Sequence, residues 1–243
     1  MPALIVTGGS RGIGAACVRL GAARGWGVAF GYRRSDDEAA ALVDEVTAAG
    51  GRAIAVRGDV ADEGDVTALF DAGAAAFGGV GGLVNNAGVL GAPAPLADIA
   101  LDRWQATLAT NLTGAFLCMR EAVRRMARSR GGRGGAIVNV SSMAAVLGGA
   151  GEFTDYAATK GALDTLTIGL AKEVAGEGIR VNGVRPGLID TDIHEAGRLD
   201  RLVATVPMAR VGTPEEVARA ILWLLSDEAA YTTGVTVNVS GGR

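Results

Sequence analysis

Histidine and cysteine are scarce in this 243-residue chain. His194 is the only histidine, which all but excludes a histidine-based catalytic triad or a cluster of histidine metal ligands. Cys17 and Cys118 are the only cysteines, and the sequence contains no Cys-x-x-Cys pair. We therefore expect neither a disulfide scaffold nor a metal site.

The chain also lacks an excess of positive charge. Its formal net charge is −3, which argues against a nucleic-acid partner. No uninterrupted apolar run has the length needed to span a membrane. The first predicted strand begins at Ala3, which leaves no room for a signal peptide. We expect a cytoplasmic protein with no membrane partner.

Two apolar patterns alternate from one end of the chain to the other. Short β-branched runs, typical of buried parallel strands, lead into segments with apolar residues at helical spacing. A chain of this length could form two small domains, but no long linker or internal repeat divides it. The pattern predicts one α/β domain over residues 1–243, a doubly wound parallel sheet of about seven strands with helices on both faces. The predicted strands are residues 3–7, 27–32, 53–56, a strand that ends at 85, 136–140, 179–184 and 235–239.

Start signals mark two of the predicted helices. Ser35 with Glu38 has the pattern of a capping box, and so has Thr213 with Glu216. A third, long helix is predicted over residues 103–128 from its apolar spacing.

The first strand leads into a helix through a loop that contains Gly8, Gly9, Gly12 and Gly14. Such a loop directs backbone N–H groups toward a pyrophosphate at the helix N-terminus. Gly8 and Gly12 would allow a tight turn, and Gly14 would let the helix pack close to the strand. The spacing differs from the common Gly-x-Gly-x-x-Gly fingerprint. An ordinary glycine-rich turn remains the alternative, because the chain has 38 glycines.

Polar and turn-forming residues follow directly after most of the predicted strands. In a parallel sheet these positions share the carboxyl edge, where doubly wound folds bind ligands. Each residue alone could be turn chemistry, but their common placement predicts a binding site at this edge. They are Gly8, Arg33, Arg34, Asp59, Asn86, Gly88, Ser141, Ser142, Pro186, Gly187 and Thr191.

A series of motifs runs in order along almost the whole chain. The motifs are Thr7-Gly8-Gly9-Ser10-Arg11-Gly12-Ile13-Gly14, Asp59-Val60, Asn85-Asn86-Ala87-Gly88, Asn111, Ser142, Tyr156-Ala-Ala-Thr-Lys160, Arg180-Val181-Asn182, Pro186-Gly187 and Thr191. In these motifs the chain resembles a classical short-chain dehydrogenase/reductase. The resemblance implies a Rossmann-type fold and an oxidoreductase that transfers a hydride between a nicotinamide cofactor and a carbonyl or secondary alcohol. Within the family the chain is similar to β-ketoacyl-carrier-protein reductases and also to sugar dehydrogenase-like members.

The resemblance assigns catalysis to Asn111, Ser142, Tyr156 and Lys160. Tyr156 and Lys160 lie on one helical face, and the usual tyrosine pKa of ~10 is too high for a base at neutral pH. A nearby ammonium lowers that pKa, so Lys160 is expected to make Tyr156 a usable general acid or base. Ser142 would position the substrate oxygen, with Ser141 as the alternative. Asn111 would hold a water that relays protons to the lysine, unless it is a surface residue.

The resemblance also assigns the cofactor site. Asp59 would accept a hydrogen bond from the adenine amino group, and Thr191 with the backbone near Ile189 would hold the carboxamide. Lys160 would also hold the nicotinamide ribose. The expected cofactor contacts are Gly8, Ser10, Arg11, Gly12, Ile13, Gly14, Arg33, Arg34, Asp59, Val60, Asn86, Ala87, Gly88, Tyr156, Lys160, Pro186, Gly187, Ile189 and Thr191.

The end of the second predicted strand favours NADP(H) over NAD(H). NAD sites usually carry an acidic residue at this position. This chain has Arg33 and Arg34 instead, which would bind a 2′-phosphate, and Arg11 in the glycine loop adds a third arginine. Asp36 and Asp37 belong to the first turn of the next predicted helix. The alternative is that all three arginines are solvated.

The family resemblance leaves the substrate open. Its walls are expected from residues 90–96 and 143–153, and from a mobile lid around residues 190–210 that fits neither a strand nor a core helix. Three polar residues of these walls could bind a hydroxylated substrate or be solvated: Glu152, His194 and Glu195.

Two other classes of protein remain open at this point. A catalytically silent dinucleotide-binding sensor or regulatory subunit would need neither Tyr156 nor Ser142. A scaffold would bind no dinucleotide at all. Because members of the family are usually tetramers, we expect a homotetramer or a dimer. Helices 103–128 and 156–174 and strand 235–239 would supply its interfaces.

Overall fold

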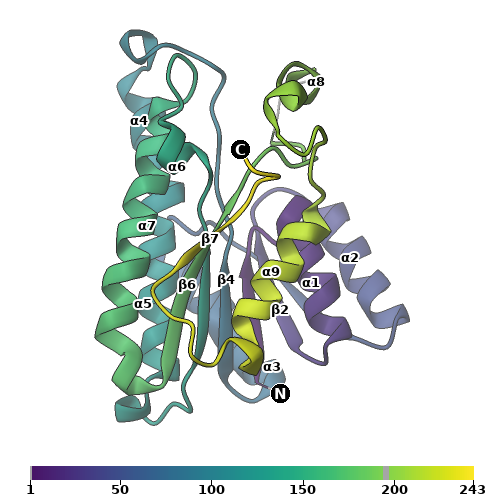
Figure 1. Cartoon of the computed structure of the whole chain (residues 1–243). Coiled ribbons are helices and arrows are strands. Elements are labelled where there is room, and N and C mark those ends of the chain that lie inside the picture. Colours follow the sequence, from purple (N-terminus) through teal and green to yellow (C-terminus); the bar gives the residue numbers. More distant parts are fainter. Residues whose placement is uncertain (1, 194–196) are drawn as a thin grey trace.

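The computed structural model describes residues 2–193 and 197–243. Seven parallel strands form one sheet in the order β3-β2-β1-β4-β5-β6-β7 (Figure 1). The strands are β1 (Ala3–Thr7), β2 (Gly27–Tyr32), β3 (Arg52–Arg57), β4 (Val80–Asn85), β5 (Gly135–Val140), β6 (Ile179–Pro186) and β7 (Thr236–Val239). The order runs outward from β1 in one direction and from β4 in the other. The predicted doubly wound, Rossmann-type α/β fold is therefore confirmed.

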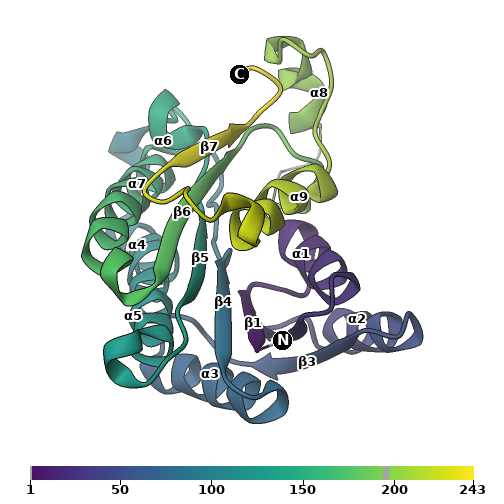
Figure 2. The same ribbon diagram turned by 60° about the horizontal axis from the view of Figure 1, so that its bottom comes forward.

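Helices cover both faces of the sheet (Figure 2). Helices α1, α2 and α9 pack on one face, and α3, α5 and α7 pack on the other. The helices are α1 (Gly12–Ala23), α2 (Asp36–Ala48), α3 (Glu63–Phe77), α4 (Leu101–Leu108), α5 (Ala115–Met126), α6 (Ala144–Leu147), α7 (Thr154–Val174), α8 (Arg198–Leu202) and α9 (Pro214–Leu225). Short helical turns are η1 (Leu96–Asp98), η3 (Arg128–Arg130), η4 (Ala175–Glu177), η5 (Val203–Thr205) and η6 (Asp227–Ala229), and η2 (Ala109–Gly114) is a π-helical segment.

Two apolar cores lie on the two faces of the sheet. Because successive side chains of a strand point to opposite faces, Leu4 of β1 belongs to the core under α1 and α9, and Ile5 belongs to the core under α3 and α5. Both side chains are fully buried. A continuous apolar strand such as β1 therefore supplies both cores at once, as expected of a parallel sheet covered on both sides.

One predicted helix cap is confirmed and one is wrong. The Thr213 side chain accepts a hydrogen bond from the backbone N–H of Glu216, and the Glu216 side chain accepts one from the backbone N–H of Thr213. Helix α2 begins after Ser35 as predicted, but the Ser35 side chain makes no capping hydrogen bond. The Ser35 backbone has a ψ of 65°, outside the extended conformation that capping residues usually adopt.

The long helix predicted over residues 103–128 is interrupted. It consists of α4 and α5 with the π-helical segment η2 between them. The segment contains Asn111, whose side chain is bonded to a neighbouring loop. Such π segments are frequent at functional sites, and apolar spacing alone does not distinguish them from α-helix.

The segment around residues 190–210 contains helical structure that the sequence analysis did not predict. Ile189 pairs with Gly212 in an isolated parallel bridge, and α8 and η5 lie between them in the chain. His194 and Glu195 lie outside the described residues. The role of this segment as a lid stays a prediction. Among the helices of the described ranges, none is long and apolar enough to cross a membrane.

Candidate active site

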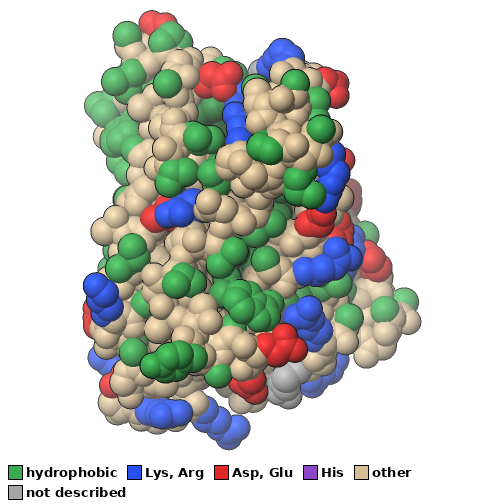
Figure 3. All heavy atoms as spheres, viewed as in Figure 1, with side chains coloured by type: hydrophobic (Ala, Val, Ile, Leu, Met, Phe, Trp, Pro, Cys, Tyr) green, Lys and Arg blue, Asp and Glu red, His purple; other side chains and the backbone are tan. Residues whose placement is uncertain are grey.

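A cleft of about 880 Å³ opens at the carboxyl edge of the sheet. Figure 3 shows its mouth at the top of the molecule, between the lobe that contains α6 and the lobe that contains α8, with basic side chains inside it. All the predicted catalytic and cofactor-binding residues line this cleft except Gly14 and Asn111, which lie behind its wall. A volume of this size is typical of small-molecule and cofactor sites.

The glycine loop forms a cradle that side chains would fill. Gly8 and Gly12 have φ angles of +61° and +51°, which favour glycine. A Cβ at Gly14 would lie 2.1 Å from the carbonyl oxygen of Gly8. The Asn86 side chain fixes the loop, because its amide nitrogen donates to the carbonyl oxygens of Thr7 and Gly8 at 3.0 Å each. These contacts fit the pyrophosphate of a dinucleotide at the start of α1.

We predict that Gly14→Ala weakens dinucleotide binding at least tenfold and destabilises the fold by about 1–3 kcal/mol, because the added methyl group must displace the backbone of the loop. Fluorescence titration with NADPH and urea unfolding measure the two effects. Gly169→Ala is the matched control: Gly169 lies in the interior of α7 with no atom within 4 Å of an added Cβ. Equal dinucleotide affinities in the two variants would contradict the prediction.

Ser142 and Tyr156 line the same cleft, and the Ser142 side chain acts to lower the pKa of the Tyr156 phenol. Ser142 follows β5, and Tyr156 lies in the first turn of α7. The neighbouring Ser141 is buried and donates instead to the backbone carbonyl of Lys160 at 3.2 Å. The structure therefore brings Ser142, and not Ser141, to the tyrosine hydroxyl.

Lys160 is buried one helical turn after Tyr156. Its Nζ donates to the backbone carbonyl of Val140 at 2.7 Å, and it lies 5.6 Å from the centroid of the Tyr156 ring. Burial lowers the pKa of Lys160 to about 8, although the Asp164 carboxylate opposes this change. The ammonium is therefore still mostly protonated at neutral pH.

The expected lowering of the Tyr156 pKa is not found. Burial raises the pKa of Tyr156 above its usual value, and the Ser142 side chain offsets only part of that increase. The physical reason is that the Lys160 ammonium is bonded to the Val140 carbonyl and does not contact the phenol oxygen directly. The phenol of Tyr156 is therefore protonated at neutral pH.

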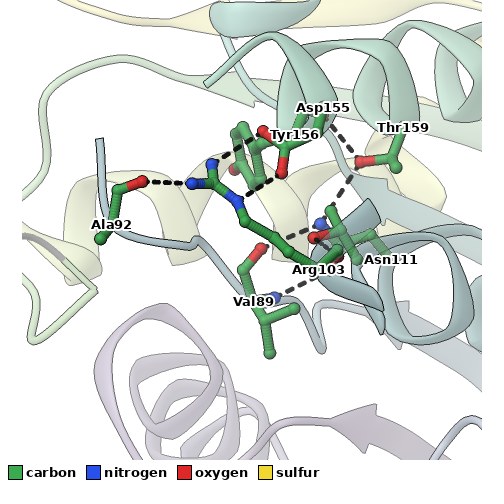
Figure 4. A network of polar contacts seen from close by, with 8 residues as sticks. Val89, Ala92, Arg103, Asn111, Asp155, Tyr156 and Thr159 are labelled. Carbon is green, nitrogen blue, oxygen red and sulfur yellow. Dashed lines mark hydrogen bonds and ion pairs between the residues drawn. The ribbon is translucent and has the colours of Figure 1, made fainter. Parts of the chain in front are cut away.

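A polar network lies directly behind Tyr156 (Figure 4). Asn111 is 1% exposed, so the alternative of a surface residue is wrong. Its amide oxygen accepts from the backbone N–H of Val89 at 2.8 Å, and its amide nitrogen donates to the Val89 carbonyl at 3.0 Å and to Thr159 Oγ1 at 3.3 Å. Asn111 thus ties η2 to the loop after β4 and to α7. A water relay at Asn111 stays a prediction.

Arg103 belongs to the same network and was not predicted from the sequence. Its Nε and Nη2 donate to the two carboxylate oxygens of Asp155 at 2.8 and 3.0 Å, and its Nη1 donates to the Ala92 carbonyl at 2.5 Å. Asp155 is 1% exposed and immediately precedes Tyr156. The two residues are 52 positions apart in the chain, so no local pattern could indicate this pair.

The arginines expected at the adenosine end of the cleft differ in their partners. Arg33 Nη1 lies 3.0 Å from Asp59 Oδ2, and Arg11 Nη1 lies 3.5 Å from Asp192 Oδ2. In the described ranges no ion pair is found for Arg34, which is exposed and lines the cleft. Burial acts to raise the pKa of Asp59, but the Ala61 N–H and the Arg33 guanidinium outweigh it and lower that pKa.

Two further basic residues line the cleft and were not singled out from the sequence, Arg198 of α8 and Arg243. Arg198 falls within the predicted lid but has no motif around it, and Arg243 lies far from every motif in the chain. Only the tertiary structure places them in the cleft.

A glycine cradle at the switch point of a doubly wound sheet, beside a tyrosine and a lysine one helical turn apart, defines a nicotinamide-dependent oxidoreductase. Comparison with known proteins agrees. Residues 8–243 match the family model described as enoyl-(acyl carrier protein) reductase. The chain belongs to the classical short-chain dehydrogenase/reductases and acts on CH–OH groups with a nicotinamide dinucleotide.

The similar proteins span the full length of the chain. An oxidoreductase of Escherichia coli (strain K12), YgfF, whose activity is uncharacterized, is 50% identical over 100% of both chains. The 3-oxoacyl-[acyl-carrier-protein] reductase of Synechocystis is 41% identical over 98% of this chain and 95% of its own. A short-chain dehydrogenase from Burkholderia cenocepacia J2315, solved in complex with NADP, is 36% identical over 99% of this chain and 97% of its own, with a TM-score of 0.92.

Proposed function

We propose that this protein catalyses reversible hydride transfer between NADP(H) and a carbonyl or secondary alcohol, with Ser142, Tyr156, Lys160 and Asn111 as its catalytic group. The observation that carries the proposal is that the Ser142 and Tyr156 side chains line the same cleft as Lys160 and the glycine cradle. A protein that only senses a dinucleotide needs neither hydroxyl group.

Tyr156 and Ser142 have different roles at the substrate oxygen. The dinucleotide, when bound, supplies or accepts the hydride. Tyr156 donates a proton to the substrate oxygen during reduction, because its raised pKa keeps the phenol protonated at neutral pH. Ser142 holds the same oxygen by a second hydrogen bond.

Lys160 and Asn111 act beside the hydroxyl groups of Ser142 and Tyr156: Lys160 through its charge and its donors, and Asn111 by fixing a loop. One ammonium proton of Lys160 is bonded to Val140, so two donors remain for the nicotinamide ribose. The positive charge of Lys160 would also stabilise the phenolate that forms as Tyr156 gives up its proton. Asn111 fixes the loop after β4 against α7 through Val89 and Thr159.

The experiment that tests the proposal is NADPH oxidation by the purified protein with a panel of ketones, β-ketoesters, acyl-thioester analogues and ketoses. We expect turnover with at least one of these classes of carbonyl compound. Tight NADPH binding with no turnover on any of them would overturn the proposal and favour the silent sensor.

We predict that Arg34→Ala raises the Kd for NADPH by about 10- to 100-fold and leaves the Kd for NADH unchanged, because a charge-assisted contact to the 2′-phosphate is lost. Arg33→Ala is expected to have the smaller effect, since Asp59 already neutralises part of its charge. The measurement is a pair of titrations with NADPH and NADH. Arg24→Ala, at the exposed C-terminal end of α1, is the control. If NADPH and NADH weaken equally in Arg34→Ala, Arg34 does not select the cofactor.

A further inference from the structure

Arg198 of α8 lines the cleft and contacts Glu152 and Phe153. Its Nη2 lies 2.7 Å from Glu152 Oε2, and its central carbon lies 4.6 Å from the centroid of the Phe153 ring. Phe153 is buried and immediately precedes α7, three residues before Tyr156. Arg198, Glu152 and Phe153 all line the same cleft as Tyr156.

Most hydrogen-bonding capacity of Arg198 is unused by the protein. Its side chain is only 11% exposed, and its Nε and Nη1 are buried with no hydrogen-bond partner among the described residues. A guanidinium carries five N–H donors in a planar fork. Buried donors on a cation are costly unless they are paired. Arg198 therefore has more donors than its single contact with Glu152 uses.

The charge of this part of the cleft favours an anion as a further acceptor. The lining from Ser142 to Phe153 carries one acidic residue, Glu152, which lies beside Arg198. Asp192, which also lines the cleft, is paired with Arg11. Glu152 is 43% exposed in its side chain and can turn toward solvent, whereas Arg198 is held over the Phe153 ring. The remaining wall residues are small or apolar, among them Met143 and Leu147.

We infer that Arg198 binds a carboxylate of the substrate, so that the substrates are oxo- or hydroxycarboxylic acids with an apolar skeleton. This inference rests on the proposed function and names its substrate class. Glu152 occupies the guanidinium until the substrate carboxylate replaces it in a bidentate contact. The apolar skeleton then lies against Phe153 and Met143, and the reacting oxygen reaches Ser142 and Tyr156.

The test compares 5-oxohexanoate with its methyl ester as substrates with NADPH. In the unaltered protein we expect a lower KM for the acid than for the ester. Arg198→Gln is expected to raise the KM for the acid by about 10- to 100-fold and to abolish the preference over the ester. Arg198→Lys, which keeps the charge without the fork, is expected to lie between the two. Glu152→Gln is expected to change the KM in the opposite direction. It removes the competing carboxylate and therefore lowers the KM for the acid.

Arg24→Gln, which removes one positive charge far from the cleft, is the control and is expected to change neither KM. Thermal unfolding of each variant shows whether it is folded. Equal KM values for acid and ester in the unaltered protein, or an equal effect of Arg198→Gln on both, would overturn the inference.

A binding experiment separates the inference from the proposed function. Hexanoate and hexanamide are titrated calorimetrically into the protein in the presence of NADP⁺. We expect hexanoate to bind more tightly than hexanamide, and Arg198→Gln to remove the difference. If no carbonyl compound is reduced but this difference is found, the proposed function fails and the carboxylate site stands. If hexanoate binds no better than hexanamide, the carboxylate site is rejected whatever the turnover.

Discussion

Replacing Tyr156 by phenylalanine is expected to lower kcat by about 10²–10⁴-fold while the Kd for NADPH changes less than threefold. The substitution removes only the phenol hydroxyl, and it keeps the ring beside Lys160. Single-turnover kinetics with the best carbonyl substrate, together with an NADPH titration, make the measurement. Retention of more than a tenth of the activity would show that another group supplies the proton.

The rates of carbonyl reduction and of alcohol oxidation are expected to depend on pH in different ways. Because burial raises the pKa of Tyr156, the phenol stays protonated through the neutral range, and carbonyl reduction has its acid available there. Alcohol oxidation needs the phenolate as base, so its rate is expected to increase with pH into the alkaline range. A rate of oxidation that is flat from neutral to alkaline pH would contradict this assignment.

Removing Arg103 is expected to destabilise the protein by about 3–5 kcal/mol, because it leaves the carboxylate of Asp155 buried without its partner. The pair has two hydrogen bonds of 2.8 and 3.0 Å, and Asp155 is almost inaccessible to solvent. Urea unfolding of Arg103→Ala at a fixed protein concentration measures the loss. Asp155→Ala is expected to be comparably damaging.

Arg19 provides a matched control for Arg103. It also forms two hydrogen bonds to one carboxylate, that of Glu45, but both of these side chains are about half exposed. Exposed pairs contribute about 0–1 kcal/mol, so Arg19→Ala is expected to change stability little. Equal losses in Arg19→Ala and Arg103→Ala would show that burial does not govern the contribution of the Arg103 pair.

The Arg103 pair also has a consequence for the active site. It joins α4, the loop at Ala92 and the first turn of α7, where Tyr156 lies one residue after Asp155 (Figure 4). A variant of Arg103 that still folds is therefore expected to lower kcat as well as stability, since the position of the tyrosine hydroxyl depends on this turn.

The sequence alone determined the fold and the place of the site. Continuous β-branched runs and helical apolar spacing depend on residues that are close along the chain, and they predicted the parallel strands and the helices that cover them. In a parallel sheet every strand ends at the same edge, so the residues that follow the strands, from Gly8 to Thr191, had to converge on one cleft. The Thr213 cap was predictable for the same reason, because its partner Glu216 is three residues away.

Only the tertiary structure decided the properties that depend on contacts between distant segments. The Lys160 ammonium bonds to Val140 on the neighbouring strand, which leaves burial as the main influence on the pKa of Tyr156. Asn111 lies in a π-helical segment, and its side chain is bonded across to Val89. Arg198 meets Glu152 across the cleft from 46 residues away in the chain. Desolvation and pairing energies depend on what surrounds a group in three dimensions, and no local sequence pattern records those surroundings.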